Sequence, residues 1–144
     1  MKDKLTIGWK EIIDLPELGL FNIAAKTDTG AGTSVLHCES LKVLIKDKQK
    51  HIQCQLIVNY ETHDTIQVTL PVYKVKTIKS SFGQSEKRYI VLTKIRLFNQ
   101  LFDIKLSFRN RTKMAYPMLL GRNFIQHKFL VDVAKSNLSK KAIR

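Results

Sequence analysis

Hydrophobic and polar residues alternate with a period of two along much of the chain. The clearest runs are residues 64–70 and 101–109, and residues 52–60 alternate in the same way. Such alternation is typical of antiparallel strands that turn one face to the core and the other to solvent. Further strands are expected at residues 41–45, 72–78 and 89–98.

Polar turn segments separate these runs, at residues 46–48, 61–63, 80–83 and 98–100. Short strands divided by regular turns are typical of a β-barrel or a β-sandwich. Helical character is confined to residues 122–129, directly after Gly121. We therefore predict an all-β fold with one short C-terminal helix, as a single domain over residues 1–135. A basic, mobile tail is expected over residues 136–144.

The composition makes the chain strongly basic. Its 144 residues include 25 Lys and Arg against 12 Asp and Glu, and the net charge is −2 over residues 1–40 but +15 over residues 41–144. A positive field attracts nucleic acid, an anionic membrane surface or an acidic polypeptide, although it also fits a solvated surface that aids solubility. Nucleic-acid binding is possible, but no motif supports it. No apolar run reaches the ~18 residues of a membrane-spanning helix, so no membrane partner is expected.

The first residues lack the apolar stretch of a secretory leader, so a cytoplasmic protein is expected. Its two cysteines are then expected as reduced thiols. The candidate metal ligands are His37, Cys38, His51, Cys54 and His63. Strand alternation turns His37 away from Cys38 and His51 away from Cys54, and no His-Glu-x-x-His motif occurs. We therefore expect no metal site, and without a Gly-rich Lys-Ser/Thr loop we expect no bound nucleotide.

The segment best suited to chemistry is residues 24–34, Ala-Ala-Lys-Thr-Asp-Thr-Gly-Ala-Gly-Thr-Ser. Its one acid, Asp28, follows an apolar run and stands among small and hydroxyl residues. Small residues let a substrate backbone approach closely, and hydroxyl groups can bond to loop amides. Asp28 is therefore either a catalytic carboxylate or the acceptor of an Asx turn, and local composition alone favours the turn.

A second segment, residues 118–125, reads Met-Leu-Leu-Gly-Arg-Asn-Phe-Ile. The pair formed by an Asp-Thr-Gly-Ala loop and a later apolar-apolar-Gly-Arg-Asn segment resembles the retropepsin-like aspartic peptidase superfamily. Residues 7–10, 26–37, 81–86 and 110–122 look like the branch of it named ATP-dependent zinc proteases. The resemblance covers residues 7–133. That branch is bacterial and archaeal, and it is often found with the ATP-grasp ligase that adds glutamates to ribosomal protein S6.

The resemblance implies a small closed β-barrel whose catalytic loop is Asp28, Thr29 and Gly30. Aspartic proteolysis needs two carboxyl groups around one water, one ionised as the base and one protonated as the acid. The sequence holds no second Asp-Thr/Ser-Gly, so a homodimer would have to supply the second Asp28. By resemblance, Thr29 would join the two loops and Gly30 would admit substrate. Zinc and ATP are implied by the branch name alone, and we expect neither as a cofactor.

The resemblance implies two further groups of residues. Loop support would come from Ala31, Leu119, Leu120 and Gly121. A flap and nearby basic residues would bind substrate, namely Lys79, Ser81, Gly83, Glu86, Arg88, Arg111 and Arg122. One position departs from the pattern, because retroviral proteases carry an acid where Gly32 stands, and that acid pairs with the Arg of their Gly-Arg segment. Arg122 is therefore expected either to find another acid or to point at the substrate.

Sequence and resemblance together predict an aspartic-type peptidase. Its expected substrate is an acidic peptide or a glutamate-tailed protein, cut at a peptide bond or at a γ-linked glutamyl amide. The alternative is a non-catalytic module on the same fold that holds an acidic polypeptide or a ribosome-associated partner. The oligomeric state separates these hypotheses, because a monomer cannot assemble two Asp28 carboxylates. A third hypothesis, an RNA-associated basic protein, predicts RNA binding that weakens steeply with salt.

Overall fold

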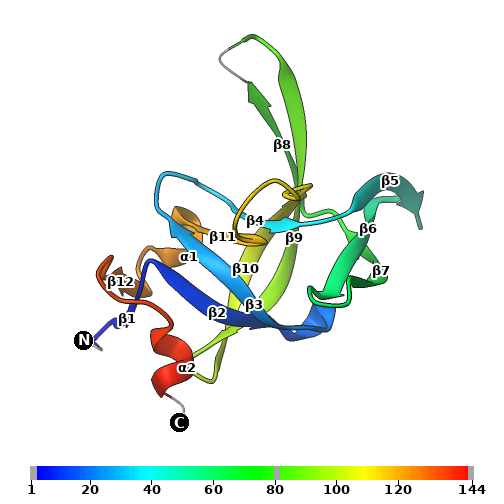
Figure 1. The fold of residues 1–144 in the computed structure, drawn as a ribbon. Helices are drawn as coiled ribbons and strands as arrows, with labels where there is room; N and C mark the ends of the chain where they lie inside the picture. Colours follow the sequence, from blue (N-terminus) through cyan, green and yellow to red (C-terminus); the bar gives the residue numbers. More distant parts are fainter. Residues whose placement is uncertain (1–2, 80–81, 143–144) are drawn as a thin grey trace.

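The computed structural model describes residues 3–79 and 82–142, and strands dominate it (Figure 1). The predicted all-β fold class is confirmed. The elements in chain order are β1 (Leu5–Ile7), β2 (Lys10–Leu15), the 3-10 helix η1 (Pro16–Leu18), β3 (Leu20–Asp28), β4 (Ser34–His37), β5 (Ser40–Lys46), β6 (Gln49–Asn59), β7 (Asp64–Pro71), β8 (Lys74–Lys79), β9 (Ser85–Leu97), β10 (Gln100–Arg109), β11 (Met118–Gly121), α1 (Arg122–Ile125), β12 (Phe129–Val131) and α2 (Leu138–Ala142).

Strand pairings close the main sheet into a ring. The order β10-β4-β11-β3-β2-β9 returns to its start because β9 also pairs with β10. β11 runs parallel to β3 and antiparallel to β4, so it lies between them. The link between β2 and β9 is short, at Asp14 and Arg96. This closure leaves the barrel strands with few open edges.

The barrel encloses the core as the alternation predicts. In β10, Ile104, Leu106 and Phe108 are buried, whereas Lys105 and Arg109 are exposed. Burial of apolar side chains is the main force that favours the folded state. Three phenylalanines, Phe102, Phe124 and Phe129, add an aromatic cluster with ring centroids 5.3–6.2 Å apart.

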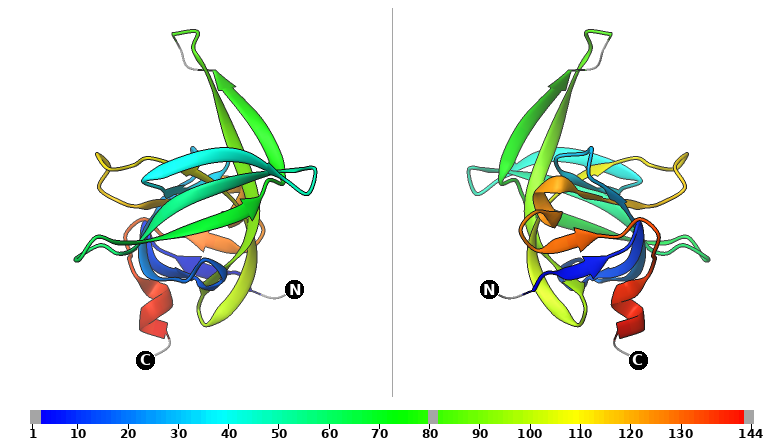
Figure 2. Two further views of the ribbon diagram at one scale, coloured as in Figure 1. Left: turned by 90° about the vertical axis from the view of Figure 1, so that its right-hand side faces the viewer. Right: turned by 90° about the vertical axis from the view of Figure 1, so that its left-hand side faces the viewer.

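Two structures extend from the barrel. β5, β6 and β7 form a separate three-stranded antiparallel sheet beside it. β8 pairs with the first half of β9, and this hairpin projects away from the barrel as an arm (Figures 1 and 2). Gly83, at φ +81°, lies in the turn of the arm, where glycine adopts the left-handed conformation without strain. The arm includes the segment predicted as a flap, apart from residues 80–81, which lie outside the described residues. β1 and α2 lie at the opposite end of the molecule.

The C-terminal region differs from the prediction. The helix expected over residues 122–129 ends at Ile125, and residues 126–128 form a turn before β12 pairs in parallel with β1. The helix stops because Phe129 enters the aromatic cluster and the chain turns at His127, at φ +70°. The segment expected as a basic, mobile tail includes helix α2, Leu138–Ala142.

A buried carboxylate explains why this segment is ordered. Glu11 on β2 is fully buried, and its carboxylate accepts hydrogen bonds from the backbone N–H groups of Gly8 at 2.8 Å, Leu138 at 3.1 Å and Ser139 at 2.9 Å. Gly8 has no room for a side chain, because a Cβ there would lie 2.1 Å from the carbonyl oxygen of Lys135. Glu11 therefore clamps the C-terminal segment against the start of the barrel.

We expect Glu11→Ala to lower the free energy of unfolding by about 3 kcal/mol, because three N–H groups lose a charged acceptor. Urea unfolding followed by circular dichroism measures this change. Glu61→Ala, at an exposed position in the turn after β6, is the matched control and should leave the midpoint unchanged. Equal midpoints for the two variants would contradict the clamp.

Candidate active site

Asp28 is the last residue of β3, and its Cα is the register partner of Gly121 on β11. Its side chain is half-buried. The Gly30 N–H donates to Oδ1 of Asp28 at 3.1 Å, and the Ala31 N–H donates to its carbonyl oxygen at 3.2 Å. The Asx turn considered from the sequence is therefore present. It uses one carboxylate oxygen, and within the described residues no hydrogen bond engages the other.

Backbone hydrogen bonds to the start of α1 hold the loop that follows Asp28. The N–H of Arg122 donates to the carbonyl of Ala31 at 2.7 Å, and the N–H of Asn123 donates to the carbonyl of Gly32 at 3.0 Å. The N–H of Gly121 donates to the buried Ser34 hydroxyl at 2.9 Å. The loop and the Gly-Arg-Asn segment, distant in sequence, thus form one unit.

The other side of the loop is fixed by the N-terminal segment. The Thr27 hydroxyl donates to the carbonyl of Gly8 at 2.7 Å, and the Thr27 N–H donates to the carbonyl of Trp9 at 2.8 Å. The Trp9 ring packs edge-on against Tyr116, with centroids 6.0 Å apart. The strand end that carries the carboxylate is therefore held from both sides.

The residues expected to support the loop do so unequally. Leu120 is fully buried in the core and Gly121 is buried against residues 32–34. Leu119 points the other way, because successive strand residues alternate, and it lines a cleft beside the loop. Ala31 supports the loop through its carbonyl, as described above, and it lines the same cleft.

Arg122 adopts neither of the two arrangements expected for it. Its Nη1 donates to the carbonyl oxygen of Thr29 at 2.8 Å. It does not line the cleft beside the loop, and in the described part of the chain it forms no ion pair with an acid. Because Gly32 carries no carboxylate, the Arg122 guanidinium bonds to the backbone of the loop in its own chain.

A cleft of about 250 Å³ separates the loop from the arm formed by β8 and β9. Ala31, Gly32 and Thr33 line it on the loop side, while Ile78 and Ile90 line it on the arm side. The described residues that line it include no acid and four cations, which are Lys76, Arg88, Arg109 and Arg111. The cleft is therefore suited to an anionic group.

Arg111 connects this cleft to the loop that carries Asp28. Its side chain is 9% exposed, and its Nε donates to the carbonyl of Tyr116 at 3.1 Å. Burial lowers the pKa of Arg111, as does nearby Arg109, whereas the carboxylate of Asp28 acts in the opposite direction. Asp28 therefore lies within electrostatic reach of this guanidinium.

His37 positions the backbone of Arg111. The buried His37 ring accepts the Arg111 N–H at its Nδ1, at 2.7 Å. An accepting Nδ1 assigns the proton to Nε2, which donates to Glu39 at 3.2 Å. Glu39 also contacts His63.

The structure brings together only part of the predicted flap and substrate-binding set. Arg88 and Arg111 meet at the cleft. Lys79 and Gly83 lie out on the arm, and Glu86 forms an ion pair with Arg88 at 3.2 Å. Ser81 lies outside the described residues.

Known proteins resemble this chain over most of its length. A family model described as the retropepsin-like aspartic endopeptidase RimB matches residues 6–142. The chain belongs to this RimB-like family. The match extends through α2, so the clamped C-terminal segment lies within the region that the family model covers.

Relatives of this RimB-like chain include much longer proteins. A protein of Desulfotalea psychrophila named probable alpha-L-glutamate ligase is 31% identical over 132 residues, which are 91% of this chain and 28% of that protein. A protein of the same name from Shewanella pealeana is 33% identical over 135 residues, 93% of this chain and 30% of that protein. The chain thus spans less than a third of the curated relatives that it matches.

A solved structure shares the fold of this RimB-like chain. A crystal structure of a Legionella pneumophila protein of unknown function superposes with a TM-score of 0.77 and 25% sequence identity. The match covers 95% of this chain and 99% of that one.

Sequence reasoning missed some residues of the site. Arg109 was not singled out, and His37 was considered only as a metal ligand. A signal existed for Arg109, because Lys105, Ser107 and Arg109 share the polar face of one alternating strand, and this face of β10 lines the clefts. No local pattern marks His37 as the acceptor of an N–H group 74 residues away.

Within residues 3–79 and 82–142, no three His, Cys, Asp or Glu side chains gather in a way that could hold a metal ion. Among the helices that the structure describes, none is long and apolar enough to cross a membrane. That zinc and ATP do not bind stays a prediction.

The two cysteines are buried and free. Burial raises the pKa of Cys38 to about 11 and that of Cys54 to about 12. Both thiols are therefore protonated at pH 8, and a thiolate-directed reagent should leave the folded protein unmodified but label both residues in urea. Labelling followed by mass spectrometry tests this, and rapid labelling of the native protein would contradict it.

Proposed function

We propose that the chain is one subunit of a homodimeric aspartic-type peptidase that cleaves an acidic polypeptide. One observation carries the proposal. The half-buried carboxylate of Asp28 lies on a braced loop, within electrostatic reach of Arg111 in a cleft that contains four cations and opens beneath a hairpin arm. A carboxylate alone would be a turn residue, but a carboxylate beside a cationic, covered cleft fits hydrolysis of an anionic chain.

In the proposed mechanism, two Asp28 carboxyl groups, one from each subunit, flank a water molecule. Two carboxyl groups so close cannot both ionise easily, so one stays protonated. The ionised carboxylate removes a proton from the water, and the protonated one donates to the carbonyl oxygen of the scissile bond. The Asx bond from the Gly30 N–H fixes the carboxylate plane. The arm would close over the substrate and exclude bulk water.

The cleft supports the choice of substrate. Arg88, Arg109 and Arg111 present planar guanidinium groups, which bind carboxylates with two parallel hydrogen bonds. Relatives named probable alpha-L-glutamate ligase support a glutamate-rich substrate, since a ligase that adds glutamates makes a chain of this chemistry. We therefore propose a glutamate-tailed protein as the substrate.

A second candidate is a non-catalytic module that binds the same acidic chain. Gly32 favours this candidate, because it provides no carboxylate for the ion pair with Arg that retroviral proteases form. Arg122 instead donates to the carbonyl of Thr29 in its own chain. In this alternative the cationic cleft binds the acidic chain without cleaving it, and the only role of Asp28 is to accept the hydrogen bond of its Asx turn.

The test is an incubation of the purified protein with ordinary and glutamate-tailed peptides across pH 4–8, read by mass spectrometry. Sedimentation is measured at the same concentrations. Cleavage by a dimer is the expected result, and product masses name the bond. A strict monomer that binds the glutamate-tailed peptides without cutting any of them would overturn the peptidase in favour of the binding module.

A further inference from the structure

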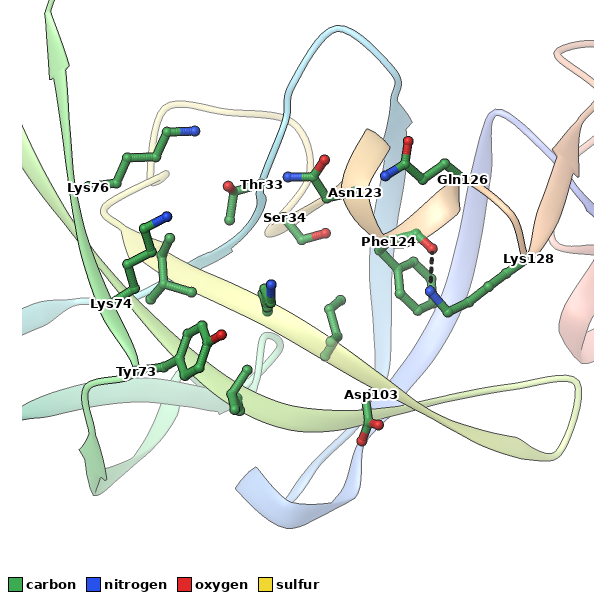
Figure 3. Close-up of a pocket in the computed structure, with 14 residues that line it drawn as sticks. Thr33, Ser34, Tyr73, Lys74, Lys76, Asp103, Asn123, Phe124, Gln126 and Lys128 are labelled. Carbon is green, nitrogen blue, oxygen red and sulfur yellow. Dashed lines mark hydrogen bonds between the residues drawn. The ribbon is translucent and has the colours of Figure 1, made fainter.

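A second and larger cleft, of about 760 Å³, adjoins the first. It lies between the base of the arm, strand β10 and the segment around α1 (Figure 3). Figure 3 shows Lys74 and Lys76 on the arm side, with Asn123 and Gln126 facing them from the α1 side. Lys105 and Lys128 also line this cleft.

The two clefts form one groove. Both are lined by Thr33, Lys76 and Ile90, so the second cleft continues the first away from the catalytic loop. Together their described lining residues include seven cations, which are Lys74, Lys76, Arg88, Lys105, Arg109, Arg111 and Lys128. The lining includes one acid, Asp103, which is ion-paired with Lys94.

Two lysines of the second cleft, Lys105 and Lys128, contact aromatic rings and a carbonyl group rather than acids. The Lys105 ammonium lies over the Tyr73 ring, 5.4 Å from its centroid. The Lys128 ammonium lies 5.3 Å from the Phe124 ring centroid and donates to the carbonyl of Phe124 at 3.2 Å. Within the described residues, Lys74, Lys76, Lys105 and Lys128 form no ion pair. The charge of these four lysines is therefore not neutralised by an acid, and Lys105 and Lys128 are also held in position.

We propose that this second cleft is a distal subsite that binds acidic side chains several residues away from the scissile bond. An extended chain advances about 3.3 Å per residue, so a segment that enters beside Asp28 continues along the groove past Lys76 toward Lys105. Asn123 and Gln126 offer amide groups for its backbone or its carboxylates. The consequence is a requirement for length, because a single glutamate fills the first cleft but only a run of acidic residues reaches the second. This inference rests on the proposed function.

The groove favours an acidic polypeptide over a nucleic acid. Its walls combine the cations with the aliphatic side chains of Ile90, Leu92 and Ile104, which suit the methylene groups of glutamate. Among the described lining residues, Tyr73 and Phe124 are the aromatic side chains. The Lys105 and Lys128 ammonium groups lie over one face of each ring, so these two faces are not free for base stacking.

The experiment uses peptides that share one cleavable site and carry one, three or six glutamates on either side of it. We expect kcat/KM to rise about tenfold from one to six glutamates on one side only, since each exposed charge pair contributes little alone. The Lys74→Gln/Lys105→Gln variant should lose this gain and cleave the one-glutamate peptide as the parent does. Lys42→Gln/Lys48→Gln, an equal change of charge at exposed positions on β5 and its turn, is the control and should keep the gain.

Binding of fluorescein-labelled hexaglutamate, measured by anisotropy, separates failure of the subsite from failure of the peptidase. If cleavage does not depend on the number of glutamates, the distal subsite is overturned and the peptidase stands. If no peptide is cut but hexaglutamate binds the parent and not Lys74→Gln/Lys105→Gln, the subsite stands and the peptidase is overturned. Tighter binding of hexauridylate than of hexaglutamate, lost in that variant, would overturn the acidic polypeptide in favour of RNA.

Discussion

Asp28→Asn should cleave acidic peptides about 10²–10⁴-fold more slowly than the parent protein, the range expected when a general acid–base group is lost. The amide of asparagine cannot take a proton from water at the pH values of the assay. Its oxygen can still accept the Gly30 N–H, which lies 3.1 Å from Oδ1 in the parent. The loop should therefore keep its conformation, and the loss should be chemical rather than structural.

Mass spectrometry of the products measures this loss, and thermal unfolding checks that the variant is folded. Asp47→Asn is the matched control, since Asp47 is exposed, lies in the turn after β5, and has φ +51°, which asparagine adopts readily. Equal cleavage by the parent and Asp28→Asn would show a contaminant or a mechanism without Asp28, and would end the aspartic assignment.

Mixing subunits extends the same prediction to the dimer. If one active site needs two Asp28 carboxyl groups, an excess of Asp28→Asn subunits should suppress parent activity by forming mixed dimers with one carboxyl group each. Activity that stays proportional to the amount of parent protein after subunit exchange would contradict a shared site.

Gly121→Ala is expected to give the second large effect, a loss of about 3 kcal/mol in the free energy of unfolding. A Cβ at this position would lie 2.7 Å from the carbonyl carbon of Thr33, 2.9 Å from the carbonyl oxygen of Gly32 and 2.9 Å from the nitrogen of Ser34. All three are backbone atoms, so relief requires β11 to move away from the catalytic loop. Because Gly121 is the register partner of Asp28, activity should fall with stability.

Gly32→Ala is the control for this prediction. Its added Cβ would meet the Arg122 Nη2 at 3.7 Å and the Asn123 Nδ2 at 3.8 Å, which are ordinary contacts with flexible side chains. Chemical denaturation should therefore place this variant within about 0.5 kcal/mol of the parent, as for most substitutions that create no clash. Equal stability of the two variants would show that the loop and β11 are not packed as tightly as the structure indicates.

Of the described strands, β5 to β10 were predictable because their alternation is local, whereas β1 to β4, β11 and β12 were not predicted. The pattern in residues 101–109 gave β10 within one residue, since one face must meet the core and the other must meet water. The last helix, α2, was not predictable in the same way. The acceptor that orders it is Glu11, 128 positions before Ser139, and an acid within an alternating strand normally indicates a solvent face.

The site, too, was predictable only in part. The resemblance paired the Asp28 loop with the Gly121 segment, and the structure shows them in contact. It did not predict the partner of Arg122, because the Thr29 carbonyl is a backbone group with no signature in the sequence. The cationic groove forms only when the arm, β10 and the α1 segment meet in space, so residues from three separate regions had to be placed first.

The clamp between Glu11 and α2 has a consequence for how this domain can be joined to others. Both ends of the described chain lie at the end of the molecule opposite to the arm (Figures 1 and 2). Glu11 holds the C-terminal segment there. A longer polypeptide can therefore be joined at this end of the molecule without passing over the arm and the groove at its base. The fold can therefore be one domain of a longer protein, as in the relatives in which the matching region is less than a third of the protein. Tags, tethers or surface attachment at either end should leave the groove open.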